Sequence, residues 1–230
     1  MTPRDREHRP SGSRDAGKPW RIPANSLGIR SMKRRTSLPG SPAERVIGYS
    51  IHAGDNDSFY YEFGEGVPAC PACGLVTRLD WLNPTFLLER TGFDVSFTWD
   101  LAPTVSQRFV TFVSAYPGAR FLPLPAAPGF SLFILDPIVP FDAERRGTEF
   151  MDPCPGCARF TQIAGADPVY LKPGPVLPKG FSRTDIEFGS ARERPDRATA
   201  QSPQFLVDPE LGEARASQAF RGLRLEPIRE

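Results

Sequence analysis

The sequence predicts an α+β fold, with a mixed or antiparallel sheet and two main helices. Segments with strand character outnumber helical ones, and several strands follow one another without a helix between them. A parallel α/β sheet would alternate the two kinds of element regularly. The 26 prolines, about 11% of the 230 residues, are roughly twice the usual share. Because proline fixes φ and lacks an amide donor, we expect many loops and few long helices.

Residues 1–45 are expected to be a disordered basic tail that precedes one domain over residues 46–230. The tail carries eleven Lys or Arg and four acids, whereas the rest carries 17 and 23. The basic run 33–35 suits nucleic acid or a lipid surface, but equally a solvated tail or an extension upstream of a start at Met32. The acidic remainder disfavours nucleic acid as a partner.

The chain has no apolar run of the roughly 20 residues that a membrane span needs. The N-terminal residues also lack the apolar segment of a signal peptide. We therefore expect a cytoplasmic protein with no membrane partner, in a compartment where paired CxxC units more often bind metal than form disulfides.

The first elements of the domain are expected between residues 58 and 117. The aromatic run 58–63 predicts a strand, and residues 93–99 alternate apolar and polar side chains as a half-buried strand does. Ser106 can cap a helix over residues 106–116, which Pro117 ends.

Strands dominate the middle of the chain. Residues 120–124 and 129–139 are expected to be strands, and the second is mostly apolar and therefore central in the sheet. Residues 160–164, 184–188 and 204–207 are expected to add three more.

The last elements are a helix and a strand. Asp208 is expected to be an N-cap, with Pro209 in the first helical position. The helix should end by Gly222, and residues 223–228 should close the sheet as a strand.

The chain shows a loose internal repeat, with halves at approximately residues 59–140 and 141–230. Each half holds a Cys-Pro-x-Cys pair, a strand opening near an Asp, a capped helix and a glycine followed by alternating apolar residues. Two copies would share one sheet. The alternative is that the likeness of the halves arises by chance, because a glycine followed by alternating apolar residues is common after helices.

All four cysteines fall in two CxxC units, Cys70 with Cys73 and Cys154 with Cys157. Two intervening residues let both thiolates of a unit reach one metal ion at roughly 2.3 Å. Amides of the tight turn can donate to the sulfurs. Four thiolates leave no open ligand position, so the spacing predicts one structural zinc ion per chain.

Three features bear on this zinc prediction. The 80 residues between Cys73 and Cys154 far exceed the 15–20 of a simple zinc ribbon, which favours a zinc-ribbon-like clasp between the two halves. Ala158 stands where the first unit has Gly74. A redox or disulfide pair is the rival, but a thioredoxin-type thiol begins a helix, whereas residues 75–79 are strand-like.

No catalytic set is evident, and we expect a protein that is not an enzyme. The sequence has no motif of a serine hydrolase, phosphate-binding loop or zinc protease. His8 lies in the tail, and His52 has no partner nearby in sequence. Four acids either converge on a cleft or are solvated strand and turn positions: Asp94, Asp100, Asp185 and Glu187.

The chain resembles a bacterial family of double-CxxCG proteins, known chiefly from myxobacteria and assigned as immunity proteins of polymorphic toxin systems. The resemblance spans roughly residues 59–228 and is carried by both CxxC units and by residues 163–166, 181–190, 202–207 and 222–228. It implies a cytoplasmic antidote that binds and blocks a cognate toxin. The alanine at 158 departs from the pattern, and the tail has no counterpart.

Three functions are therefore weighed. The first is an immunity protein that neutralises a protein toxin and carries a structural zinc. The second is a zinc-ribbon nucleic-acid module, favoured by the tail but opposed by the acidic domain. The third is a CxxC thiol oxidoreductase. We favour the first, and the toxin, its interface and the oligomeric state are left open.

Overall fold

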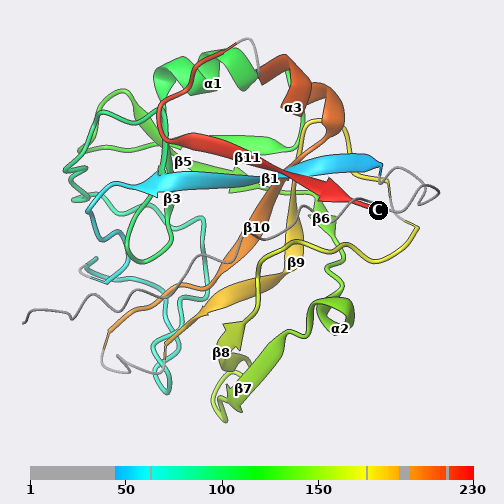
Figure 1. The fold of residues 1–230 in the computed structure, drawn as a ribbon. Helices are drawn as coiled ribbons and strands as arrows, with labels where there is room; N and C mark the ends of the chain where they lie inside the picture. Colours follow the sequence, from blue (N-terminus) through cyan, green and yellow to red (C-terminus); the bar gives the residue numbers. More distant parts are fainter. Residues whose placement is uncertain (1–44, 63, 175, 192–196, 216–217) are drawn as a thin grey trace, which may run out of the picture. The chain divides into compact units, whose positions relative to one another are not determined.

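The computed structural model describes residues 45–62, 64–174, 176–191, 197–215 and 218–230 (Figure 1). Residues Ala43–Glu230 form one compact unit. The expected disordered tail, with the basic run 33–35 and His8, lies outside the described residues except for Arg45. No helix among the described residues is long and apolar enough to cross a membrane.

The unit is built on a mixed sheet of eleven strands, which confirms the α+β class. The strands are β1 (Val46–Asp55), β2 (Val95–Phe97), β3 (Pro103–Ser106), β4 (Ala119–Pro123), β5 (Phe130–Leu135), β6 (Ile138–Val139), β7 (Glu149–Pro153), β8 (Phe160–Ala164), β9 (Phe181–Ser190), β10 (Ser202–Val207) and β11 (Leu223–Arg229). Their order is β4-β5-β3-β2-β1-β10-β9-β8-β7, with β11 also paired to β1 and β6 to β9. Only β1–β2 and β6–β9 are parallel among these pairs.

Three helices are described, α1 (Gln107–Val113), α2 (Ala143–Arg146) and α3 (Pro209–Arg215). The two expected caps are present: Ser106 Oγ accepts from the Phe109 amide at 3.3 Å and Asp208 Oδ1 from the Leu211 amide at 2.8 Å. Helix α1 ends at Val113, short of the expected residue 116. The short helix α2 was not expected from the sequence.

The strand expected over residues 58–63 is wrong for its described part, because residues 58–62 contain bends and a turn but no strand. The backbone amides of Tyr60, Tyr61 and Glu62 all donate to the Asp100 carboxylate. Successive amides of a strand point to opposite sides, so three in a row on one carboxylate require a turn. A buried acid far along the chain therefore overrides the β propensity of the aromatic run.

The strand expected over residues 129–139 is two strands. β5 ends at Leu135, Asp136 and Pro137 follow, and β6 then pairs with β9 instead of continuing beside β4. Proline has no amide to donate to a ladder, so the break falls at Pro137. Strands β1, β3 and β7 were not expected from the sequence.

The two expected halves are not evident in the topology. Their matching ends, residues 118–124 and 222–228, join different neighbours: β4 pairs with β5, whereas β11 pairs with β1. The internal repeat stays a hypothesis.

The main core lies between the sheet and helices α1 and α3, which sit together at one end of the sheet (Figure 1). Phe133 is fully buried, and its ring contacts those of Phe109, Phe121, Phe181 and Phe205 at centroid distances of 5.3–5.8 Å. A second core joins the long loop between β1 and β2 to the sheet through Tyr60, Tyr61, Val76, Phe86 and Leu132. This second core positions the first CxxC unit.

Candidate metal centre

The four cysteines expected to bind metal lie together. Their Sγ atoms are all within 4.8 Å of one another, and all four are free thiols. Cys70 and Cys154 are 3.9 Å apart at sulfur, and Cys73 and Cys157 are 3.8 Å apart. Tetrahedral bonds of roughly 2.3 Å place thiolates about 3.8 Å from each other. The cluster therefore has the dimensions of a single four-thiolate metal site.

The first knuckle, residues 70–75, is a tight turn that aims both of its sulfurs inward. The Cys70 amide donates to the Leu75 carbonyl, and the Gly74 amide donates to the Cys70 carbonyl, both at 2.8 Å. Gly74 has φ +74°, in the left-handed region where only glycine is unstrained. A bridge between Ala69 and Val76 closes the turn at its base.

The second knuckle, residues 154–159, repeats this geometry. The Cys154 amide donates to the Arg159 carbonyl and the Ala158 amide to the Cys154 carbonyl, again at 2.8 Å. Ala158 takes the place of Gly74 and has φ +60°. A left-handed conformation costs a residue with a Cβ roughly 1 kcal/mol, so the second knuckle keeps the turn at the expense of strain.

Different elements hold the two knuckles in place. The second is the turn of the β7–β8 hairpin, with Pro153 opposite Phe160 at its base. The first lies in the loop between β1 and β2, where the Val76 amide donates to the Thr199 carbonyl at 3.0 Å. The knuckles touch each other at Gly156, because a Cβ there would lie 2.8 Å from the Ala72 Cβ.

The thiols differ in acidity. Backbone N–H groups, first that of Cys157, lower the pKa of Cys154 to about 7. The pKa of Cys70 is also lowered, chiefly by the amide of Ala72. Burial raises the pKa of Cys73 to about 12. One thiol in each knuckle is thus more acidic than an ordinary cysteine, and a divalent cation would offset the cost of ionising Cys73.

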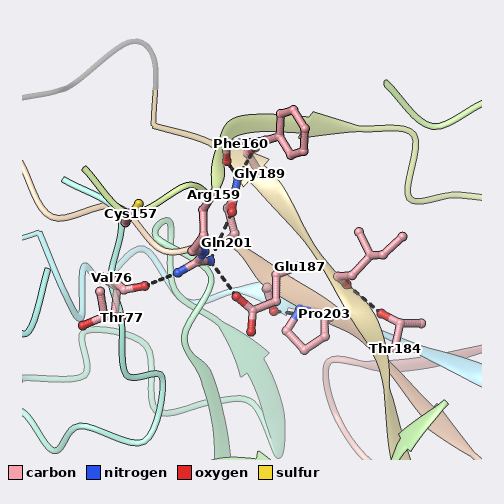
Figure 2. Close-up of polar contacts among 12 residues, drawn as sticks. Val76, Thr77, Cys157, Arg159, Phe160, Thr184, Glu187, Gly189, Gln201 and Pro203 are labelled. Carbon is pink, nitrogen blue, oxygen red and sulfur yellow. Dashed lines mark hydrogen bonds and ion pairs between the residues drawn. The ribbon is translucent and has the colours of Figure 1, made fainter. Parts of the chain in front are cut away.

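Arg159 joins the two knuckles beside the sulfur cluster (Figure 2). Its Nη1 donates to the carbonyl of Val76, the residue that follows the first knuckle, at 2.7 Å. Its Nη2 donates to Glu187 Oε2 at 2.7 Å and to Gln201 Oε1 at 3.2 Å. Gln201 in turn donates to the Phe160 carbonyl at 3.0 Å. The sequence did not point to Arg159, because these partners lie 83, 28 and 42 residues away.

The four acids considered as cleft residues do not converge. Asp94 and Asp100 are buried and accept backbone and side-chain hydrogen bonds in separate turns. Asp185 accepts from a backbone amide of the loop before α2, and Glu187 pairs with Arg159. Each carboxylate therefore accepts hydrogen bonds from its own neighbours in space, and the four do not share a cleft. Asp94 and Asp100 are buried, so they are not solvated positions either.

His52 has partners that its sequence neighbours did not reveal. Its Nε2 lies 3.1 Å from Ser50 Oγ, 3.5 Å from a Glu226 carboxylate oxygen and 3.9 Å from one of Asp167. A serine-hydrolase triad needs the nucleophile and the acid on opposite ring nitrogens. Here all three face the same nitrogen, so the group does not have the geometry of a triad.

Comparison of the chain with protein-family models, curated proteins and solved structures found no match. The resemblance to the double-CxxCG immunity family therefore stays a prediction that rests on the motifs of the sequence.

Proposed function

We propose that the four cysteines hold one structural zinc ion, and that the protein is a non-enzymatic immunity protein that binds and neutralises a cognate toxin. The observation that carries the first part is the sulfur cluster, with Sγ separations of 3.8 and 3.9 Å across the knuckles. The second part rests on the family resemblance and on the four protein ligands, which would leave no open position on the metal.

Zinc is the metal proposed because four thiolates in tetrahedral array suit it, whereas magnesium and calcium prefer oxygen ligands. Iron is the other metal that accepts this ligand set. The two facing knuckles would then form a zinc-ribbon-like clasp between segments more than 80 residues apart in sequence.

A binding role agrees with the chemistry of the site and of the surface. Four protein ligands leave a zinc ion no position for a substrate or an activated water. Residues 46–230 carry 17 basic and 23 acidic side chains, which favours association with a basic partner. The expected site of action is the cytoplasm.

The thiol oxidoreductase is the weaker candidate. A redox CxxC pair draws its low pKa from the N-terminus of a helix. Here the first knuckle leads into a bridge at Val76 and the second into β8. A nucleic-acid module would depend on the basic run 33–35, outside the described residues.

Two measurements test the proposal. Metal analysis of protein purified without added zinc should give one zinc per chain, and replacement of Cys73 by Ser should abolish it. Co-expression with the product of an adjacent candidate toxin gene should give a complex that co-purifies and a host that survives. If iron were found in the site, the metal assignment would change and the proposed immunity function would not. Absence of a complex, together with turnover of a disulfide substrate by folded protein, would replace the immunity function with thiol chemistry.

A further inference from the structure

A pocket of about 280 Å³ lies where the start of β1 meets the end of β11, beside the end of the chain marked C in Figure 1. Its charged lining comes from segments far apart in sequence: Arg45, Arg145, Lys172, Arg229 and Glu230. Apolar side chains accompany these charges, among them Ile47, Leu171 and Leu177. None of the described lining residues belongs to the sulfur cluster. The volume is near the lower end of the range of small-ligand pockets.

The charged lining of this pocket is unbalanced, with four cationic side chains against one carboxylate. Arg45 and Glu230 form an ion pair at 2.6 Å, so their charges cancel. Arg145, Lys172 and Arg229 are exposed and have no ion pair within the described parts of the chain. A terminal carboxylate on Glu230 would still leave a surplus of two positive charges. The pocket is therefore cationic, although the domain as a whole is acidic.

Hydrogen-bonded backbone carries two of the unpaired cations. Arg229 stands opposite Val46 in the antiparallel ladder of β11 and β1. The Lys172 amide donates to the Pro140 carbonyl at 3.0 Å, which ties the loop after β8 to the segment before α2. Both residues are thus held at the pocket by the fold, and only their side chains are free to adjust to a ligand.

Arg145 is the third unpaired cation and is positioned by an aromatic ring. It belongs to α2, and its Cζ lies over the ring of Tyr170, 4.2 Å from the centroid. A cation–π contact orients the guanidinium group through the face of the ring and uses none of its N–H groups. These N–H groups have no acceptor among the described residues, so they stay available for an anion. Arginine binds the oxygens of carboxylates and phosphates in pairs.

We propose that this pocket binds a small ligand with a phosphomonoester group, and that Arg145, Lys172 and Arg229 are its cationic contacts. A phosphomonoester has a second pKa of about 6, so it is mainly a dianion at neutral pH and matches the surplus charge better than one carboxylate does. The apolar side chains would contact the organic part of the ligand. This site goes beyond the proposed immunity function and depends on neither the metal nor a toxin.

Two small probes, phenyl phosphate and benzoate, test the charge match on the full, metal-loaded chain. Both carry one phenyl ring, but at pH 8 the first is a dianion and the second a monoanion. Isothermal titration calorimetry should show that phenyl phosphate binds about tenfold more tightly, because its second charge adds a charge-assisted hydrogen bond. Wild-type protein is sufficient for this comparison.

Substitutions locate the binding. R145Q and K172Q should each weaken the binding of phenyl phosphate about tenfold. The matched control R224Q removes an exposed arginine of β11 outside the pocket and should leave the affinity unchanged. K172Q keeps the test valid if R145Q perturbs α2, because the Lys172 side chain has no hydrogen bond or ion pair to lose within the described residues.

Three outcomes would overturn the proposal. The first is equal binding of phenyl phosphate and benzoate by wild-type protein. The second is a loss of affinity in R224Q as large as in K172Q, since the effect would then come from the net charge alone. The third is tighter binding of the peptide acetyl-Asp-Asp-Asp-amide than of phenyl phosphate, which would assign the pocket to an acidic segment of a protein partner instead.

Discussion

The two knuckles have the same turn but very different supports. The first lies in a loop whose described residues between β1 and β2 form isolated bridges only, yet its neighbours Tyr60, Leu75 and Val76 are at most 1% exposed. The second is the turn of a regular hairpin, but β7 is exposed along most of its length and β8 is only half-buried. Burial therefore holds the first knuckle, whereas the second depends on its ladder, on Arg159 and on the proposed metal.

The same metal-binding turn can therefore be supported by the rest of the fold in more than one way. The base of the turn is equivalent in both, Ala69 opposite Val76 and Pro153 opposite Phe160. What differs is how much packing would remain without the metal.

Removal of the metal is expected to have the largest effect. Structural zinc contributes on the order of 10 kcal/mol in small domains. We expect chelation to release the β7–β8 hairpin before the first knuckle, because little apolar area holds it. Hydrogen exchange should rise first in residues 149–164 and later in residues 69–76, which form the first knuckle and the bridge at its base. Simultaneous release of both segments would contradict the contrast between the knuckles.

Asp100→Ala should have the next largest effect and act on the loop that carries the first knuckle, and not on the second knuckle. The substitution leaves the amides of residues 60–62 without their acceptor in a buried site, a loss of about 3 kcal/mol in the free energy of unfolding. Urea denaturation measures this loss. Asp185→Ala is the matched control, because that exposed carboxylate accepts one amide and should cost below about 1 kcal/mol. Equal losses would show that the acid does not pin the loop.

Gly156→Ala tests the contact between the knuckles. The new Cβ would lie 2.8 Å from that of Ala72, so we expect a loss of about 1–2 kcal/mol in stability. The double variant Gly156→Ala with Ala72→Gly removes the opposing Cβ and should recover most of it. Thermal denaturation of the four proteins completes the cycle. A double variant no more stable than Gly156→Ala would mean that the knuckles do not pack as described.

The smallest expected effect is at the left-handed position. Ala158→Gly should stabilise the protein by about 0.5 kcal/mol, because relief of strain exceeds the entropy that glycine adds to the unfolded chain. Gly74→Ala should destabilise it by about 1 kcal/mol through the reverse change. Chemical denaturation of metal-loaded protein gives both values. The same sign for both would show that the two turns are not equivalent.

The sequence alone determined the features whose signals are local. Helix caps act over three residues, and both Ser106 and Asp208 were found as caps. Residues 160–164, predicted as a strand, are a strand with those bounds. The CxxC spacing identified all four cysteines of the cluster, since a two-residue gap by itself turns both thiols to one side.

Only the tertiary structure decided the features whose partners lie far away along the chain. The aromatic run at 58–62 has the composition of a strand, but Asp100, some 40 residues on, gathers its amides into a turn. Arg159 follows a cysteine motif with nothing to distinguish it until Val76, Glu187 and Gln201 are brought around it. Nearby residues compete through backbone propensities worth tenths of a kcal/mol, whereas a buried charge that lacks its hydrogen bonds costs several, so the distant contact prevails.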